Sequence, residues 1–235
     1  MTLLALAIAP GIVICIYIFL KDIYNKEPKR NLVASFILGM TTVIPALIAE
    51  SFSDVLHGNS FAGTAVNAYG VVALSEELSK FLVLRYYCYT RKSFDEPLDG
   101  IVYSVMVGMG FATIENIAYV YSYGYTTAFT RMFLSVPAHA SFAVLMGYYA
   151  GKAKFDPANS FKLLLTGLFW AVFFHGTFDF FLFLQKSPDV KPYVSDTLLF
   201  AGAIISYVFA IRVSRRHIRA HQQLSKELFK PDAHV

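Results

Sequence analysis

The sequence predicts an all-α protein that crosses a membrane about seven times as a helical bundle. Hydrophobic residues make up 56% of the chain and charged residues only 15%. Several runs with little or no charge approach the roughly 20 apolar residues that a helix needs to cross a bilayer. The intervening loops are short and no internal repeat is visible. We therefore expect one membrane-embedded domain at residues 1–212, followed by a basic tail at residues 213–235.

Seven apolar segments follow one another along the chain. They lie at residues 2–20, 32–49, 62–84, 101–114, 132–151, 163–184 and 197–211. The first two contain no charged residue, and the others carry at most a few ionisable side chains. Because positive charge follows the first segment rather than preceding it, we expect a retained first span and not a cleaved signal peptide.

Lysine and arginine in the loops predict the orientation, because they gather on the cytoplasmic side of membrane proteins. They occur in the first, third and fifth loops and in the tail, at Lys21, Lys26, Lys29, Arg30, Arg91, Lys92, Lys152, Lys154, Arg215, Arg216 and Arg219. The sixth loop, with Lys186 and Lys191, is the exception. We expect an external amino terminus and a cytoplasmic tail that lies against the anionic inner leaflet. The net charge of +4 then needs no nucleic-acid partner.

Two adjacent carboxylates interrupt the third segment. Glu76 and Glu77 lie about halfway along it, where each charge costs on the order of 3 kcal/mol on membrane-insertion scales. Lys80 follows one helical turn later and can neutralise one of the two. A structural ion pair between helices would explain such groups if they were alone in the membrane.

Three later segments carry further polar groups at a similar depth. They are Glu115 and Asn116, then Arg131 and His139, then His175 and Asp179. At a rise of about 1.5 Å per residue, the glutamate pair, His139 and His175 fall near the midplane, with Glu115 and Asp179 about one turn nearer the outer face. Scattered structural ion pairs would not share one level. The sequence therefore predicts a polar, water-holding cavity toward the outer leaflet.

Four segments resemble the PrsW family of intramembrane proteases, and more distantly the CAAX-prenyl endopeptidase group. They are SEELSK at 75–80, DGIVYSVMVGMGFATIEN at 99–116, RMFLSVPAHASFAVLMGYYAG at 131–151 and HGTFD at 175–179. The resemblance implies a multi-pass protease of the bacterial cytoplasmic membrane. Its substrate would be a single-span anti-sigma factor, cut first on the extracytoplasmic side during a stress response. By the family pattern, Glu76 and Glu77 are the paired glutamates, Glu115 belongs to the second motif and His175 is the essential histidine. The second motif of the prenyl-peptidase group ends in His where this chain has Glu115.

Peptide hydrolysis needs an activated water, a stabilised oxyanion and a proton for the leaving nitrogen. We hypothesise that one of Glu76 and Glu77 is the general base, while Lys80 keeps the other ionised. Which of the two is the base stays open at this point.

The remaining polar residues supply candidates for the other roles. His175, oriented by Asp179, would position the water or donate a proton. His139 and Asn116 are the best oxyanion donors, and Arg131 is a supporting residue.

Two rival readings remain. Zinc could be held by Glu77, Glu115, His139 and His175, but the HExxH motif of zinc proteases is absent, so we expect a metal-free mechanism without a cofactor. A proton- or ion-coupled transporter also places carboxylates and histidines in mid-membrane. Against it, the sequence has neither an inverted repeat nor paired broken helices.

Overall fold

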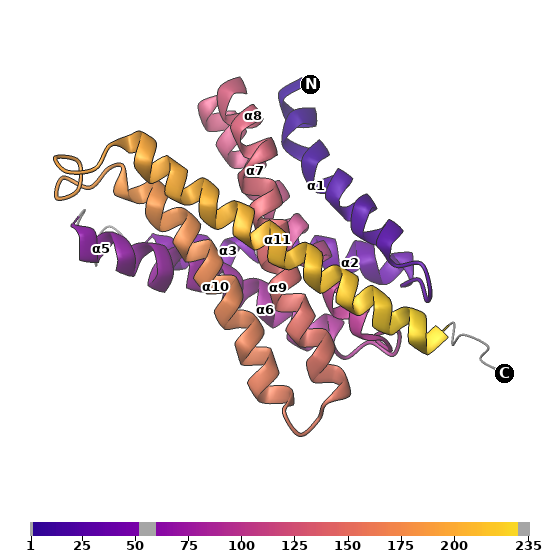
Figure 1. The fold of residues 1–235 in the computed structure, drawn as a ribbon. Helices are drawn as coiled ribbons and strands as arrows, with labels where there is room; N and C mark the ends of the chain where they lie inside the picture. The colour runs from indigo at the N-terminus through magenta and orange to yellow at the C-terminus, as the bar shows by residue number, and fades with distance from the viewer. Residues whose placement is uncertain (1, 52–59, 230–235) are drawn as a thin grey trace.

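The computed structural model describes residues 2–51 and 60–229, and every regular element in those residues is helical (Figure 1). In chain order the elements are α1 (Thr2–Lys21), α2 (Lys29–Thr41), α3 (Val43–Glu50), α5 (Phe61–Ala65), the π-helical η1 (Val66–Ala73), α6 (Leu74–Val83), the π-helical η2 (Leu84–Cys88), α7 (Pro97–Tyr123), α8 (Tyr125–Phe133), α9 (Ser135–Phe155), α10 (Ser160–Leu184) and α11 (Asp196–Phe229). The predicted all-α fold class is confirmed.

Six helical stretches in the described residues are long and apolar enough to cross a membrane. They are α1, α2 with α3, α7, α8 with α9, α10, and α11. The remaining predicted span, at residues 62–84, is helical as well, but it is divided into α5, η1, α6 and η2 and carries Glu76, Glu77 and Lys80. Short π-helical segments inside α-helices are frequent at functional sites, and here η1 of eight residues precedes α6 directly. This interrupted helix delivers the glutamate pair to the interior of the bundle.

Contacts between chain segments divide the bundle into two ends. At one end, Thr2 Oγ1 lies 3.1 Å from the Tyr125 hydroxyl, which joins the amino terminus to α8. At the other end, Gln222 Nε2 donates to the Lys21 carbonyl at 2.8 Å, which joins the last turns of α11 to the end of α1. Figure 1 shows the start of α1 and the end of α11 at these opposite ends. The first, third and fifth loops, which are rich in lysine and arginine, lie together at the second end, because Asn25 bonds to Asp95 and Lys154 bonds to the Tyr89 carbonyl. This agrees with the predicted alternation.

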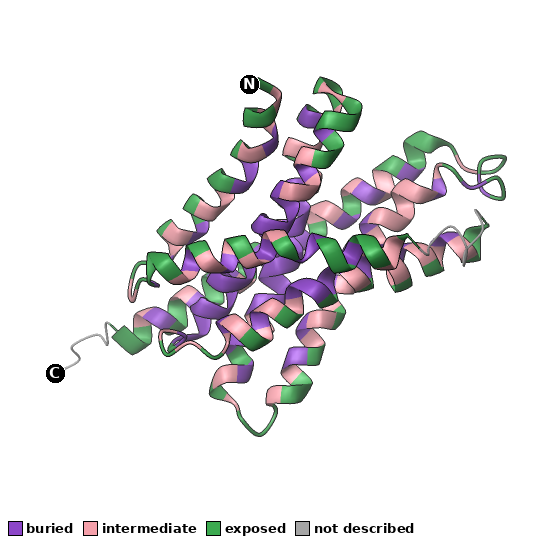
Figure 2. Ribbon diagram, turned by 180° about the vertical axis from the view of Figure 1, so that it is seen from behind, coloured by how far each residue is buried: buried purple, intermediate pink, exposed green. Residues whose placement is uncertain are grey.

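Helix α7 is the centre of the bundle, with most of its residues buried (Figure 2). A Cβ atom on Gly110 of α7 would overlap the Phe36 carbonyl oxygen of α2, and one on Gly147 of α9 would overlap the backbone of Gly100 on α7. Helices whose backbones touch in this way need glycine at the crossing points. These close approaches pack α2 and α9 directly against α7.

The predicted span at 132–151 begins with a break in the helix. α8 ends at Phe133 and α9 begins at Ser135, with Leu134 between them at φ −113° and ψ −72°. Pro137 has no N–H group to donate to the carbonyl four residues earlier, that of Phe133. The Tyr207 hydroxyl of α11 donates to this carbonyl instead, at 2.8 Å. Proline therefore explains the break, and α11 satisfies the backbone group that it frees.

Candidate functional site

The glutamate pair on α6 shares a single ammonium group. Lys80 Nζ lies 3.0 Å from Glu76 Oε2 and 2.8 Å from Glu77 Oε1, and all three side chains are almost fully buried. Because the residues are three and four positions apart on one helix, they project from the same face. Two carboxylates and one ammonium leave one negative charge uncompensated within this trio.

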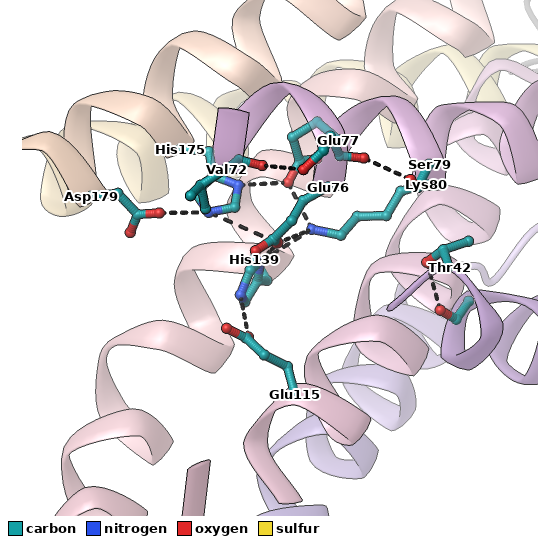
Figure 3. Close-up of polar contacts among 12 residues, drawn as sticks. Thr42, Val72, Glu76, Glu77, Ser79, Lys80, Glu115, His139, His175 and Asp179 are labelled. Carbon is teal, nitrogen blue, oxygen red and sulfur yellow. Dashed lines mark hydrogen bonds and ion pairs between the residues drawn. The ribbon is translucent and has the colours of Figure 1, made fainter. Parts of the chain in front are cut away.

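His175 of α10 joins the trio from the side (Figure 3). Its Nδ1 lies 2.9 Å from Glu77 Oε1, and its Nε2 lies 3.2 Å from Asp179 Oδ2. Asp179 is four residues further along α10, so both side chains lie on one face of that helix. Two acidic partners at opposite ends fix the orientation of the imidazole ring.

His139 of α9 connects the pair to a second acidic group. Its Nε2 lies 2.9 Å from Glu115 Oε2, and its Nδ1 lies 3.4 Å from Lys80 Nζ. An ammonium group can only donate, so Nδ1 accepts and Nε2 carries the proton toward Glu115. Glu115 also accepts from Arg131 Nη2 at 2.6 Å. The two imidazole rings are nearly perpendicular, with centroids 5.1 Å apart.

Asn116 points away from these groups, contrary to its expected role as an oxyanion donor. Its Oδ1 accepts from Arg131 Nε at 2.9 Å, and its Nδ2 donates to the Ala7 carbonyl of α1 at 2.7 Å. Both ends of the amide are therefore engaged outside the cavity described next. Asn116 holds Arg131 in place, and Arg131 itself reaches the cavity.

A cavity of about 380 Å³ opens beside these side chains. Its polar lining consists of Glu50, Glu76, Glu115, Tyr119, Arg131, Ser135, His139, His175, Asp179 and Lys186. Glu77 and Lys80 are not among the lining residues, although Lys80 bonds to Glu76, which does line the cavity. The volume exceeds that of several water molecules, each of which occupies about 30 Å³ in the liquid. The sequence-predicted water-holding cavity is therefore present in the bundle.

The cavity lies toward the end of the bundle that carries the amino terminus. It is lined by Glu50 at the last residue of α3 and by Lys186 just after α10. The side chains of Glu115 and Asp179 are 18% and 15% exposed, against 4–6% for His139 and His175, so they lie nearer the opening. The rise per residue along a helix predicted the same order, with Glu115 and Asp179 about one turn nearer the outer face than His139 and His175.

Glu50 and Lys186 were not among the sequence candidates, because both fall at the edges of predicted spans. The available signal was their position: each is the first charged residue beyond a span at the end where the cavity was expected. They add a carboxylate and an ammonium group to the cavity lining.

Four of the buried side chains form a donor set that fits a metal ion. One ligand atom from each of Glu76, Glu77, His139 and His175 lies within 4.8 Å of the others. Two imidazoles and two carboxylates are donors that zinc accepts. The set contains Glu76 in place of the Glu115 expected from the sequence, because Glu115 is turned toward Arg131. The Lys80 ammonium lies against the same carboxylates and would compete with a bound cation.

Comparison with known proteins agrees with the sequence motifs. The family model described as PrsW family intramembrane metalloprotease matches residues 27–213. The Protease PrsW of Geobacillus kaustophilus is 38% identical over 79% of this chain and 81% of its own length. The Bacillus subtilis protein of that name is 37% identical over 77% of this chain and 82% of its own length. No solved structure matches. The family match over most of the chain and the two relatives of 37–38% identity show that the chain belongs to the PrsW family of intramembrane proteases.

Proposed function

We propose that this chain hydrolyses a peptide bond of a single-span membrane protein, using a water molecule that Glu76 activates near the outer leaflet. The observation that carries the proposal is the cavity: Glu76 lines it together with His139 and His175, whereas Glu77 does not line it. A general base must reach the proton that it removes, either directly or through one water. Of the two glutamates, Glu76 meets that requirement.

Glu77 and Lys80 position the base in this proposal. Glu77 Oε1 accepts from Lys80 and faces His175 Nδ1 at 2.9 Å, so it fixes both the ammonium and the ring. Lys80 in turn holds Glu76 Oε2 at 3.0 Å. The other oxygen of Glu76, Oε1, is then the one proposed to take the proton from the water.

The proposed reaction moves one proton through Glu76. Water oxygen attacks the scissile carbonyl carbon while Glu76 takes a proton from the water. Arg131 lines the cavity and has five N–H donors, of which Nε and one on Nη2 are already used, so it is the proposed donor to the oxyanion. The carbon–nitrogen bond then breaks as Glu76 returns its proton to the leaving nitrogen. His175, fixed by Asp179, orients the attacking water.

A zinc-dependent version is the second candidate, because the donor set fits. Glu76, Glu77, His139 and His175 would hold the ion. Zinc would supply Lewis-acid polarisation of the scissile carbonyl. The description of the matching family as a metalloprotease favours this version. The Lys80 ammonium between the two carboxylates favours the metal-free one.

The proposed substrate is an anti-sigma factor with one transmembrane helix, cut on its extracytoplasmic side in the cytoplasmic membrane of a bacterium. Its support is the motif resemblance, together with the position of the cavity toward the end of the bundle expected to be external. A proton- or ion-coupled transporter is the competing class, since it would use the same buried groups.

A co-expression experiment tests the protease proposal. A tagged single-span substrate is produced with the wild-type chain, with Glu76→Gln, or with Glu227→Gln as a matched control whose carboxylate is exposed on α11 and bonds only to Gln223 among the contacts described. We expect E76Q to insert normally and leave the substrate intact, while E227Q cleaves like the wild type. Cleavage by E76Q would refute the proposal, and ion flux that disappears in E76Q would favour the transporter.

The identity of the substrate is tested separately. An anti-sigma factor and an unrelated single-span protein receive the same tags and are compared with the same enzyme. Preferential cleavage of the anti-sigma factor is expected. Equal cleavage of both would remove the substrate proposal and leave the protease proposal intact.

A further inference from the structure

A second group of buried acidic side chains lies at the opposite end of the bundle from the cavity. Asp22 follows α1, Glu27 precedes α2, Glu96 immediately precedes α7, and Asp99 lies in the first turn of α7. All four are between 0% and 3% exposed. One carboxylate oxygen from each of Asp22, Glu96 and Asp99 lies within 4.8 Å of the others. We call these four residues the acidic cluster.

One oxygen on three of these residues is anchored by a donor from the protein. Asp22 Oδ2 accepts from the Glu27 backbone N–H at 2.8 Å. Asp99 Oδ2 accepts from two backbone N–H groups just ahead of α7, at 2.8 and 2.9 Å. Glu27 Oε2 accepts from the Tyr103 hydroxyl. These bonds fix the side chains in place.

The other carboxylate oxygens of the cluster have no donor. Asp22 Oδ1, Glu27 Oε1, Asp99 Oδ1 and both oxygens of Glu96 are buried without a hydrogen-bond partner. Glu96 is the most informative of them, because its carboxylate is fully buried and converges on Asp22 and Asp99. Neither of its oxygens makes a hydrogen bond of normal geometry, although the Asp99 backbone N–H and the Ser225 hydroxyl lie close by. Buried polar atoms in native structures almost always have a partner.

Among the described residues, no positively charged side chain forms an ion pair with the cluster, although Lys26 and Lys154 are near enough to Asp22 and Asp99 to act on them electrostatically. Within residues 2–51 and 60–229, no lysine, arginine or histidine nitrogen lies within 4.0 Å of any of these four carboxylates. The glutamate pair of α6 provides the contrast, because the Lys80 ammonium bonds to both of its carboxylates. Buried carboxylates are normally paired with a cation or coordinate a metal.

We infer that the acidic cluster binds a hard divalent cation of the Mg²⁺ or Ca²⁺ class. The five unpartnered atoms are all carboxylate oxygens, which such ions prefer, and the cluster contains neither sulfur nor imidazole ligands. The ion would supply both the missing charge and the missing partners.

The cation would join two parts of the chain at the end expected to face the cytoplasm. Asp22 and Glu27 belong to the connection between α1 and α2, and Glu96 and Asp99 belong to the start of α7. α11 is attached to the same region through Gln222, which donates to the Lys21 carbonyl at 2.8 Å. The site therefore stabilises the packing of α7, the central helix, and is separate from the cavity that holds Glu76.

Thermal unfolding of the full chain in detergent tests the inference. Metal-stripped protein is titrated with Mg²⁺ or Ca²⁺ at constant ionic strength, with NaCl as the control. We expect a saturable rise in Tm of about 5–10 °C at a cation concentration 100-fold above Kd. The rise should disappear in Glu96→Gln and persist in Glu76→Gln, which leaves the acidic cluster intact. Should E96Q fail to fold, Asp22→Asn takes its place.

Direct binding provides the second readout. Mn²⁺ serves as a paramagnetic probe, and one Mn²⁺ site is expected to be present in the wild type and in E76Q but lost in E96Q. A wild-type Tm that does not respond to divalent cations would overturn the inference and indicate that protons neutralise the cluster. A response that is unchanged in E96Q would also overturn it, because the ion would then bind elsewhere.

Discussion

Glu76 and Glu77 are adjacent on α6 and share the Lys80 ammonium, yet only Glu76 lines the cavity, while Glu77 faces His175. Successive residues of an α-helix point about 100° apart, so one of two neighbours can face a cavity while the other packs against an adjacent helix. This difference gives the two carboxylates separate roles and makes those roles separable by experiment.

We predict that small carboxylates rescue one glutamate and not the other. Glu76→Ala and Glu77→Ala should each lower the cleavage rate, the first by about 10²–10⁴-fold because it removes the general base. Formate can enter the cavity and replace the Glu76 carboxylate, so cleavage by E76A should rise with formate concentration. Cleavage by E77A should not respond. Rescue of E77A with no rescue of E76A would instead identify Glu77 as the general base and Glu76 as the positioning residue.

Removal of Lys80 should destabilise the protein. Lys80→Met leaves two buried carboxylates without a counter-charge, and breaking a buried ion pair from one side costs about 3–5 kcal/mol. Denaturation in detergent should show this loss, and the double variant Glu76→Gln/Lys80→Met should recover part of it, since one carboxylate is then neutral. A K80M variant as stable as the wild type would mean that the charges are compensated in another way.

Contact between α7 and α9 can be tested with a pair of glycine substitutions. A Cβ atom at Gly147 would overlap the backbone of Gly100, so Gly147→Ala should lower the free energy of unfolding by about 1–3 kcal/mol or more. The matched control is Gly70→Ala in η1, where the nearest atom to the new Cβ is Val66 Cγ1 at 3.8 Å, an ordinary contact. Equal stability of the two variants would contradict the close packing of α7 on α9.

Stability should also depend on pH when no divalent cation is present. Burial raises the pKa of Glu27 and of Glu96 to about 7, from 4.5 in the unfolded chain. Between pH 4.5 and 7 the folded state therefore binds more protons than the unfolded state does. The resulting stabilisation of the folded state is complete below pH 4.5 and is lost as the pH rises through 7.

Thermal unfolding in a chelator at several pH values measures this dependence. We expect the Tm to fall between pH 5.5 and 8, and to fall less in Glu96→Gln, whose amide does not ionise. An E96Q profile as steep as that of the wild type would assign the effect to other groups.

The sequence predicted the membrane fold and the convergence of the polar groups for a simple reason. Depth along a helix follows from a fixed rise per residue, so the level of Glu76, His139 and His175 can be calculated without knowing how the helices pack. In the structure, Glu76 and His139 each lie within hydrogen-bonding range of Lys80. His175 bonds to Glu77, which also bonds to Lys80.

The direction in which each side chain points was harder to predict, because it depends on how each helix is rotated about its axis. Asn116 has the right depth for the cavity but faces α1 instead. Glu50 lay one residue beyond the predicted end of its span and was overlooked, although it lines the cavity. The acidic cluster was missed because its members come from two loop regions and a helix start, which only the tertiary packing brings together.

Zinc dependence is the prediction that separates the two catalytic versions. Lys80 Nζ already lies within 3.0 Å of both carboxylates. We therefore expect purified enzyme with substoichiometric zinc to cleave a single-span substrate as fast as zinc-repleted enzyme does. A zinc-selective chelator should be used with Mg²⁺ in excess, so that loss of a cation from the acidic cluster does not unfold the protein. The chelated enzyme and a zinc-repleted sample are compared after their Tm values have been shown to be equal.

Loss of cleavage that zinc alone restores would refute the metal-free mechanism and assign Glu76, Glu77, His139 and His175 as ligands. Lys80→Met would then be expected to bind zinc more tightly, because its competitor for the carboxylates is gone.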